Sequence, residues 1–70
     1  MIIIDEVLGI NEKTGKLVLL ADTKDEVPET GTATAPLIPK FNNKLEPGSI
    51  VWTTSFEVAV LDTDDTWSWK

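Results

Sequence analysis

The apolar residues of the N-terminal third fall into two runs that are joined by a polar connection. The first run extends from Ile2 to Ile10 and the second from Leu17 to Ala21, and both are short and aliphatic. Their length and β-branched content favour strands over helices. The connecting sequence Asn-Glu-Lys-Thr-Gly is typical of a hairpin loop of about three to five residues. The pattern predicts a β-hairpin in which Gly15 adopts the left-handed conformation that closes the loop.

The run from Leu17 to Ala21 contains no polar residue. A strand of this kind is expected to be buried on both faces or to pack against a partner. The sequence leaves these two alternatives open.

Between Ser49 and Leu61, apolar residues recur at alternate positions. This alternation indicates one long strand with a single apolar face, formed by Ile50, Trp52, Phe56, Val58 and Val60. The polar sequence Asp-Thr-Asp-Asp at 62–65 then reverses the chain, and residues 66–69 return with both indoles on one side. The C-terminal part is therefore predicted to form a second hairpin.

Residues 22–40 follow neither the helical nor the strand periodicity of apolar residues, and they are dominated by Thr, Pro, Glu and Ala. Because Pro holds itself and its predecessor in extended backbone, residues 35–39 are expected to be polyproline-like. We interpret residues 22–40 as an extended arm or lid, and the alternative is a surface loop that crosses from one hairpin to the next. The predicted fold is one small all-β domain over residues 1–70, with two hairpins of about four strands joined by a long Pro- and Thr-rich segment.

Composition limits how such a small chain can be stabilised. A single core in 70 residues supplies only a few kcal/mol, and small proteins usually add disulfides, a metal or partner subunits. The chain has neither Cys nor His, which excludes disulfides and leaves no ligand set for structural zinc. Although well-packed monomers of this size exist, composition favours a homo-oligomer or docking onto a larger assembly.

Charge narrows the choice of partners. Twelve acidic residues and six Lys, with no Arg, give a net charge of -6, which disfavours nucleic acid and anionic membrane surfaces. The N-terminus lacks the basic start and long apolar core of a signal peptide, and no apolar run is long enough to span a bilayer. We expect a protein that is made in a cytoplasm and binds neither nucleic acid nor membrane.

The inventory of reactive side chains argues against an enzyme. No His is present to activate Ser49, Ser55 or Ser68, and the paired carboxylates are sequence neighbours, which point to opposite faces of a strand. Asp62, Asp64 and Asp65 could offer oxygen ligands to a cation, but Asp-rich tight turns are common because Asp bonds its own backbone. We expect no catalytic residue, metal, cofactor or small-molecule substrate.

Two groups of residues are candidates for contact with a protein partner. The three indoles lie close together in sequence, and a small core rarely accommodates three, so that an exposed one would lie in an interface. The second group has the spacing of a Pro-x-x-Pro ligand, although a structural extended segment is the favoured interpretation. The candidate partner-binding residues are Trp52, Trp67, Trp69, Pro36, Leu37, Ile38 and Pro39.

Residues 47–69 also carry a recognisable arrangement. They begin with Pro-Gly-Ser, continue through a β-prone stretch to Leu-Asp-Thr-Asp at 61–64, and end with Thr66 and Trp67. This arrangement resembles the ending of small structural proteins encoded near the head genes of tailed bacteriophages. The resemblance covers about a third of the chain. It implies a virion component of the head-decoration or head-fibre type, which assembles as an oligomer or on the major capsid protein and has no enzymatic duty.

The leading hypothesis from the sequence is thus a non-enzymatic virion structural protein that decorates or stabilises a phage capsid. A second hypothesis is a small acidic inhibitor of a host protein, such as an anti-defence factor that mimics nucleic acid. The third is a carbohydrate-binding module that stacks exposed Trp on sugars.

Overall fold

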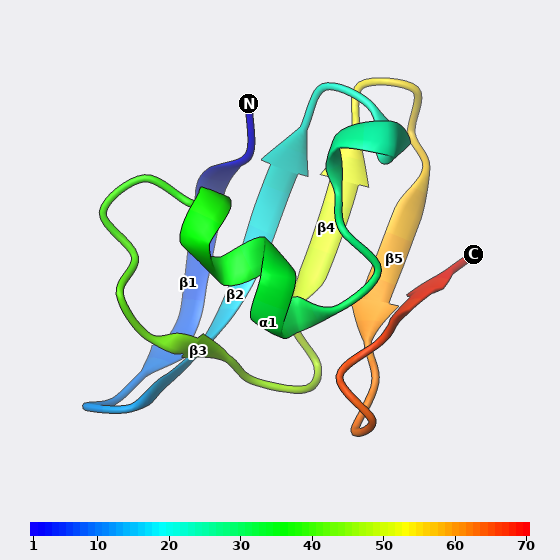
Figure 1. The fold of residues 1–70 in the computed structure, drawn as a ribbon. Helices are drawn as coiled ribbons and strands as arrows, with labels where there is room; N and C mark the ends of the chain where they lie inside the picture. Colours follow the sequence, from blue (N-terminus) through cyan, green and yellow to red (C-terminus); the bar gives the residue numbers. More distant parts are fainter.

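The computed structural model describes all residues from Met1 to Lys70, which form one mixed sheet with a short helical crossover on one side (Figure 1). The strands are β1 (Ile3–Ile10), β2 (Thr14–Ala21), β3 (Lys44–Leu45), β4 (Ile50–Thr53), β5 (Val58–Leu61) and β6 (Trp67–Trp69). The helical elements are η1 (Lys24–Glu26), α1 (Gly31–Thr34) and η2 (Ala35–Leu37). The prediction of a small all-β fold is confirmed, but six strands form where about four were predicted.

The strand order β1-β2-β4-β5-β6 explains the long connection in the middle of the chain. Neighbouring strands are antiparallel except that β2 pairs with both β3 and β4 in parallel. Parallel neighbours cannot be joined by a tight turn, so the chain has to cross the sheet between β2 and β4. The helical elements lie in this crossover and cover one face of the sheet, which we call the inner face (Figure 1).

The first predicted hairpin is present, but its loop is closed by a different residue. The Asn11 side-chain oxygen accepts hydrogen bonds from the backbone N–H groups of Lys13 (2.9 Å) and Thr14 (2.8 Å). Gly15 lies inside β2 and is not left-handed, so that prediction was wrong. A Cβ at Gly15 would lie 2.8 Å from a ring carbon of Phe41, and the glycine therefore allows the crossover to approach the sheet closely.

Of the two alternatives for the run from Leu17 to Ala21, burial on both faces within the chain is not observed, and packing against a partner stays open. Leu17, Leu19 and Ala21 point to the inner face and are buried, whereas Val18 is half-buried and Leu20 is 38% exposed. The strand lacks polar alternation because both faces are apolar, but only one face is covered within this chain.

The single long strand predicted for Ser49 to Leu61 is instead the β4–β5 hairpin. Its turn is closed by a hydrogen bond from the Thr53 N–H to the Glu57 carbonyl (2.9 Å). Trp52 and Val58 are direct cross-strand partners, so their side chains share a face. The apolar alternation therefore continues through the turn, and the periodicity alone does not indicate that the chain reverses there.

The crossover is helical where the sequence predicted an extended arm. Thr30 caps α1 by accepting a hydrogen bond from the Ala33 N–H (3.1 Å), and η2 follows directly. Pro36 lies in the first turn of η2, where its missing N–H would have had no helical partner, so it is compatible with a helix start. Of the expected polyproline stretch, Ile38 keeps an extended backbone (φ −89°, ψ 118°). Residues 22–40 thus correspond to the alternative of a connection between the hairpins, and they cover the core.

The core lies between the inner face and the crossover. Thirteen buried apolar residues form one cluster, in which the largest fully buried side chains are those of Leu17, Leu19, Val51 and Leu61 from the sheet. The buried Ser49 hydroxyl donates to the Glu46 carbonyl (2.8 Å) and accepts from the Leu17 N–H (3.2 Å). This side chain bridges β2 to the chain between β3 and β4, where the backbone ladder is interrupted.

Candidate partner-binding surface

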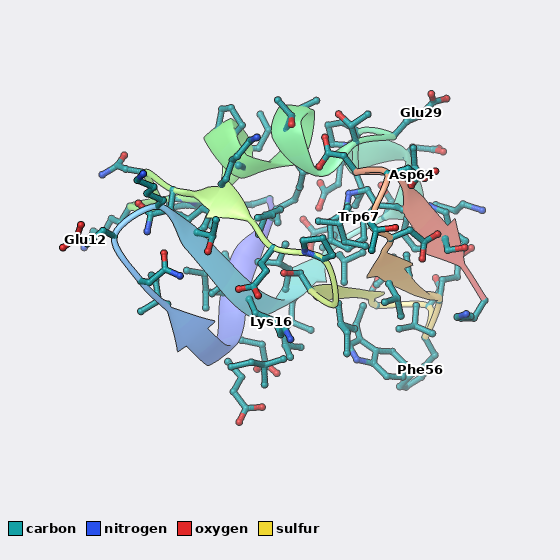
Figure 2. All side chains as sticks on the ribbon, turned by 90° about the horizontal axis from the view of Figure 1, so that it is seen from below. Glu12, Lys16, Glu29, Phe56, Asp64 and Trp67 are labelled. Carbon is teal, nitrogen blue, oxygen red and sulfur yellow. The ribbon has the colours of Figure 1, made fainter.

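The face of the sheet that points away from the crossover is apolar and is covered by no element of the chain (Figure 2). Pairing aligns its side chains in two rows across adjacent strands, one through Trp52 and the other through Ile50. We call this surface the outer face and define it by Ile3, Val18, Leu20, Ile50, Trp52, Val58 and Val60. Trp52 is 39% exposed near its centre.

Phe56 lies in the β4–β5 turn, at one end of the outer face. Its side chain is 85% exposed, and Figure 2 shows it on the side of the sheet opposite to the crossover. Its backbone is left-handed (φ 62°), a conformation that costs an L-residue about 1–2 kcal/mol and that turns normally assign to Gly or Asn. Neither the exposed ring nor the strained backbone stabilises the isolated chain.

Neighbouring hydroxyls fix the turn that holds Phe56. The Thr53 hydroxyl accepts from the N–H groups of Ser55 and Glu57, both at 3.2 Å. The Thr54 hydroxyl donates to the carbonyl of Asp22 (2.8 Å), at the end of β2. These bonds determine the turn independently of the Phe56 side chain, and strain that the surroundings impose in this way is typical of binding sites.

Few charges interrupt the outer face. Among the residues of β1, β2, β4 and β5 that have a register partner, Glu6 and Lys16 are the charged ones on this side. Lys16 crosses Gly48, where its Cε would lie 3.2 Å from an added Cβ. The aromatic end of the face at Phe56 and the cationic end at Lys16 therefore lie at opposite ends of the strands.

The free edge of the sheet adjoins this surface at β1. All eight residues of β1 are exposed, and the apolar ones include Ile4, Val7, Leu8 and Ile10. Its pairing with β2 shifts register twice, between Ile4 and Glu6 and again between Val7 and Gly9. Bulges and acidic residues make an edge a poor template for further strand pairing. The outer face is thus the more regular surface for a partner.

The three indoles do not form one site. Trp67 is buried between the sheet and the crossover (Figure 2), and its N–H donates to the Thr34 hydroxyl at 3.0 Å. Trp69 is half-buried against the core on the same side, with the Lys24 ammonium 5.1 Å from its ring centroid. Trp52 alone belongs to the outer face.

The second group of candidate residues lies on the crossover, away from the outer face. Leu37 is 51% exposed and Pro36 and Pro39 are exposed, whereas Ile38 is buried in the core. The helical turn at η2 lacks the polyproline backbone that Pro-x-x-Pro recognition requires.

The carboxylates of the C-terminal turn make structural hydrogen bonds. The Thr66 hydroxyl (2.6 Å) and N–H (3.2 Å) donate to Asp64 and lower the pKa of that carboxyl. Asp65 accepts from the hydroxyl (2.6 Å) and N–H (3.1 Å) of Thr32 and tethers the crossover. No three acidic residues are grouped so that they could hold a metal ion.

A second set of charges lies at the start of the chain. The Met1 ammonium donates to Asp22 (2.8 Å) and Glu26 (2.9 Å), and these hydrogen bonds raise the pKa of the amine. The same contact, followed by a hydrogen bond from the Asp22 N–H (2.6 Å), lowers the pKa of Glu26. All these groups are solvent-accessible, so they contribute to local order and form no buried reactive site.

The apolar alternation identifies part of the outer face, and Trp52, a predicted partner-binding residue, lies on it. The alternation at Ile50, Trp52 and Val58 was interpreted as the apolar face of a strand, without the finding that a second apolar set faces the crossover. Small residues provide the missing signal: Gly31 and Ala59 lie where close packing is needed, on the buried side. Phe56 was grouped with this strand because its left-handed turn has no glycine.

Comparison with protein-family models, curated proteins and solved structures found no match for this chain. None of its helices has the length and apolarity that a membrane crossing requires. The outer face, together with Phe56, is therefore the site on which a functional proposal can rest.

Proposed function

We propose that this chain is a non-enzymatic assembly protein that binds other protein chains through its outer face. The observation that supports this most directly is Phe56, an almost fully exposed aromatic residue in a strained conformation beside an uncovered apolar surface. Exposed apolar patches rimmed by polar residues are typical of protein interaction sites. Aromatic anchors are enriched among the residues that dominate binding energy.

In its specific form, the proposal is a virion structural protein of a tailed phage that decorates the capsid or forms the base of a head fibre. The resemblance of residues 47–69 to such proteins supports this assignment. So does the fold, which leaves one apolar face of the sheet uncovered for a partner. The partner is then a sister subunit, the major capsid protein, or both.

Mass spectrometry of purified particles of the phage that encodes this chain tests the virion assignment. We expect the chain in stoichiometric amounts, and its Phe56→Gly variant in reduced amounts. Recovery only from the lysate of producing cells would overturn the assignment and favour an inhibitor of a host protein.

The carbohydrate hypothesis receives less support from the geometry. A sugar-binding indole needs a free ring face, but Trp67 is buried and Lys24 lies over Trp69. Trp52 is flanked in its row by Leu20 and Val58 and has no polar neighbours there to orient sugar hydroxyls. An aliphatic surface of this kind matches a protein partner better than a glycan.

A further inference from the structure

We propose that the outer face binds the same face of a second copy of this chain in a two-fold dimer. The two sheets pack against each other, and each strand runs opposite to the equivalent strand of the other copy. This inference rests on the proposed function, because it names the partner of the same surface. It predicts a sandwich of two sheets in which each crossover lies on the outside.

The apolar area of the surface approaches what a stable dimer needs. Trp52 is 39% and Phe56 85% exposed, and a fully exposed aromatic side chain presents about 150–250 Å². With the aliphatic residues added at about 60–120 Å² for complete exposure, each weighted by its exposed fraction, the accessible apolar area is roughly 400 Å². A standard interface buries about 800 Å² per partner, of which about 56–65% is apolar, so that about 450–520 Å² is required and the outer face with Phe56 supplies most of it.

The charge distribution permits self-association despite the net charge of -6. Glu6 and Lys16 balance each other on the strands of the outer face, and Asp22, which lies beside Ile3 and Leu20, is paired with the Met1 ammonium. Asp64 and Asp65 are hydrogen-bonded to Thr66 and Thr32, and Figure 2 shows Asp64 on the crossover side of the sheet. Two copies can therefore meet face to face without stacking the acidic regions on each other.

The two ends of the face determine the direction of packing. If the strands of the two copies ran in the same direction, Lys16 would meet its own counterpart and the cations would repel each other. In opposite directions, the Phe56 ring of one copy lies over Lys16 and Gly48 of the other, which permits a cation–π contact at each end. A two-fold axis repeats every such contact, as an isologous interface requires.

The arrangement also gives the strain at Phe56 a role. The left-handed turn projects the ring beyond the end of β4, where its own chain offers it no contact. A partner sheet that extends past the turn would cover the ring. The free-energy cost of the left-handed backbone at Phe56 is then offset only when the dimer forms.

Sedimentation equilibrium over a wide concentration series measures the dimer directly. We expect a reversible dimer in the unmodified protein and a dissociation constant raised about 30-fold in Phe56→Gly. The same variant should raise the unfolding temperature of the monomer by about 4–8 °C, because glycine relieves the left-handed strain. Leu37→Lys is the matched control: it changes an exposed apolar residue on the crossover and should leave the dissociation constant unchanged.

Disulfide trapping tests the direction of packing, because the chain has no cysteine of its own. Phe56→Cys and Lys16→Cys should form a cross-linked dimer when the two single variants are mixed, and neither should cross-link efficiently alone. Cross-linking of Phe56→Cys with itself would overturn the opposed arrangement.

The failure of this inference differs from failure of the proposed function. A monomer at every concentration, or a dimer that Phe56→Gly does not weaken, overturns self-association through this face. If that monomer still appears in purified particles, the assembly function stands with the capsid protein as its partner.

Discussion

The two faces of this sheet are built from similar apolar residues but differ in burial on the central strands β2 and β4. On the inner face, Leu17, Leu19 and Val51 are fully buried, whereas their neighbours Leu20 and Trp52 on the outer face are more than a third exposed. The crossover covers the first set, and nothing in the chain covers the second. Apolarity of a strand face therefore indicates that the face needs a cover, and the chain itself supplies only one of the two covers.

Truncation of one leucine on each face should give the largest difference in the free energy of unfolding. Leu17→Ala removes a fully buried side chain and is expected to lower the free energy of unfolding by about 2–5 kcal/mol. Leu20→Ala, at a 38% exposed position of the same strand, should cost about 1 kcal/mol. Urea denaturation at low protein concentration measures both. Equal losses would mean that the outer face is covered in solution even under these conditions.

The packed crossover and the exposed edge strand also differ in the space that they leave for a side chain at a glycine. A Cβ at Gly31 would lie 2.7 Å from both Leu61 Cδ2 and Asp65 Oδ1, so Gly31→Ala should destabilise the fold by about 1–3 kcal/mol. Gly9, on the exposed edge strand, has no atom within 4 Å of an added Cβ. Gly9→Ala is therefore the control and should have little effect on the denaturation midpoint. A tolerated Gly31→Ala would show that the crossover can move away from the sheet.

Substitution of the indoles on the two faces should give a smaller difference in stability. Trp67→Phe removes the hydrogen bond to the buried Thr34 hydroxyl and is expected to cost about 1–2 kcal/mol. Trp52→Phe loses no hydrogen bond and should change the stability of the monomer by less than about 0.5 kcal/mol. Thermal unfolding of the two variants, followed by circular dichroism, tests this order. The reverse order would place the structural indole on the outer face.

The smallest expected effects are those of pH. The raised pKa of the Met1 amine means that its contribution is fully present below its ordinary pKa and is lost as pH rises through the raised value. Glu26 and Asp64 have lowered pKa values, so their contributions are present above their ordinary values and are lost as pH falls through the lowered ones. Stability should therefore be greatest between these limits and decline gently on either side. Asp64→Asn should reduce the acid limb in a pH series of unfolding midpoints.

Local signals in the sequence predicted the parts of the fold that depend on neighbouring residues. The apolar runs around Asn11 formed the predicted hairpin, and the Asp-rich turn at 62–65 reverses the chain before β6 as expected. The crossover could not be predicted in this way, because its short helical turns are stabilised by contacts of Val27, Ala35 and Ile38 with a sheet formed by distant residues. Its Thr and Pro composition gives no helical periodicity.

The candidate site shows the same limit. Alternation identified Trp52 as part of an apolar face, but a side chain lies on a given face whether or not another element covers that face. Trp67 was grouped with it, although only the packed structure shows that this indole reaches Thr34. Phe56 could not be identified because its importance depends on the sign of a backbone angle, which the apolar pattern does not encode.

The two register shifts in β1 have a consequence for the behaviour of the protein in concentrated solution. An exposed, apolar eight-residue strand with a regular ladder could recruit identical strands indefinitely, at the 4.7–4.8 Å repeat of cross-β fibrils. At each shift, two residues of β1 oppose one of β2, and such a spacing does not propagate in register from copy to copy. The irregular edge therefore restricts growth by strand addition. In the dimer that we propose, association uses the outer face instead, where two copies close on each other and the assembly stops.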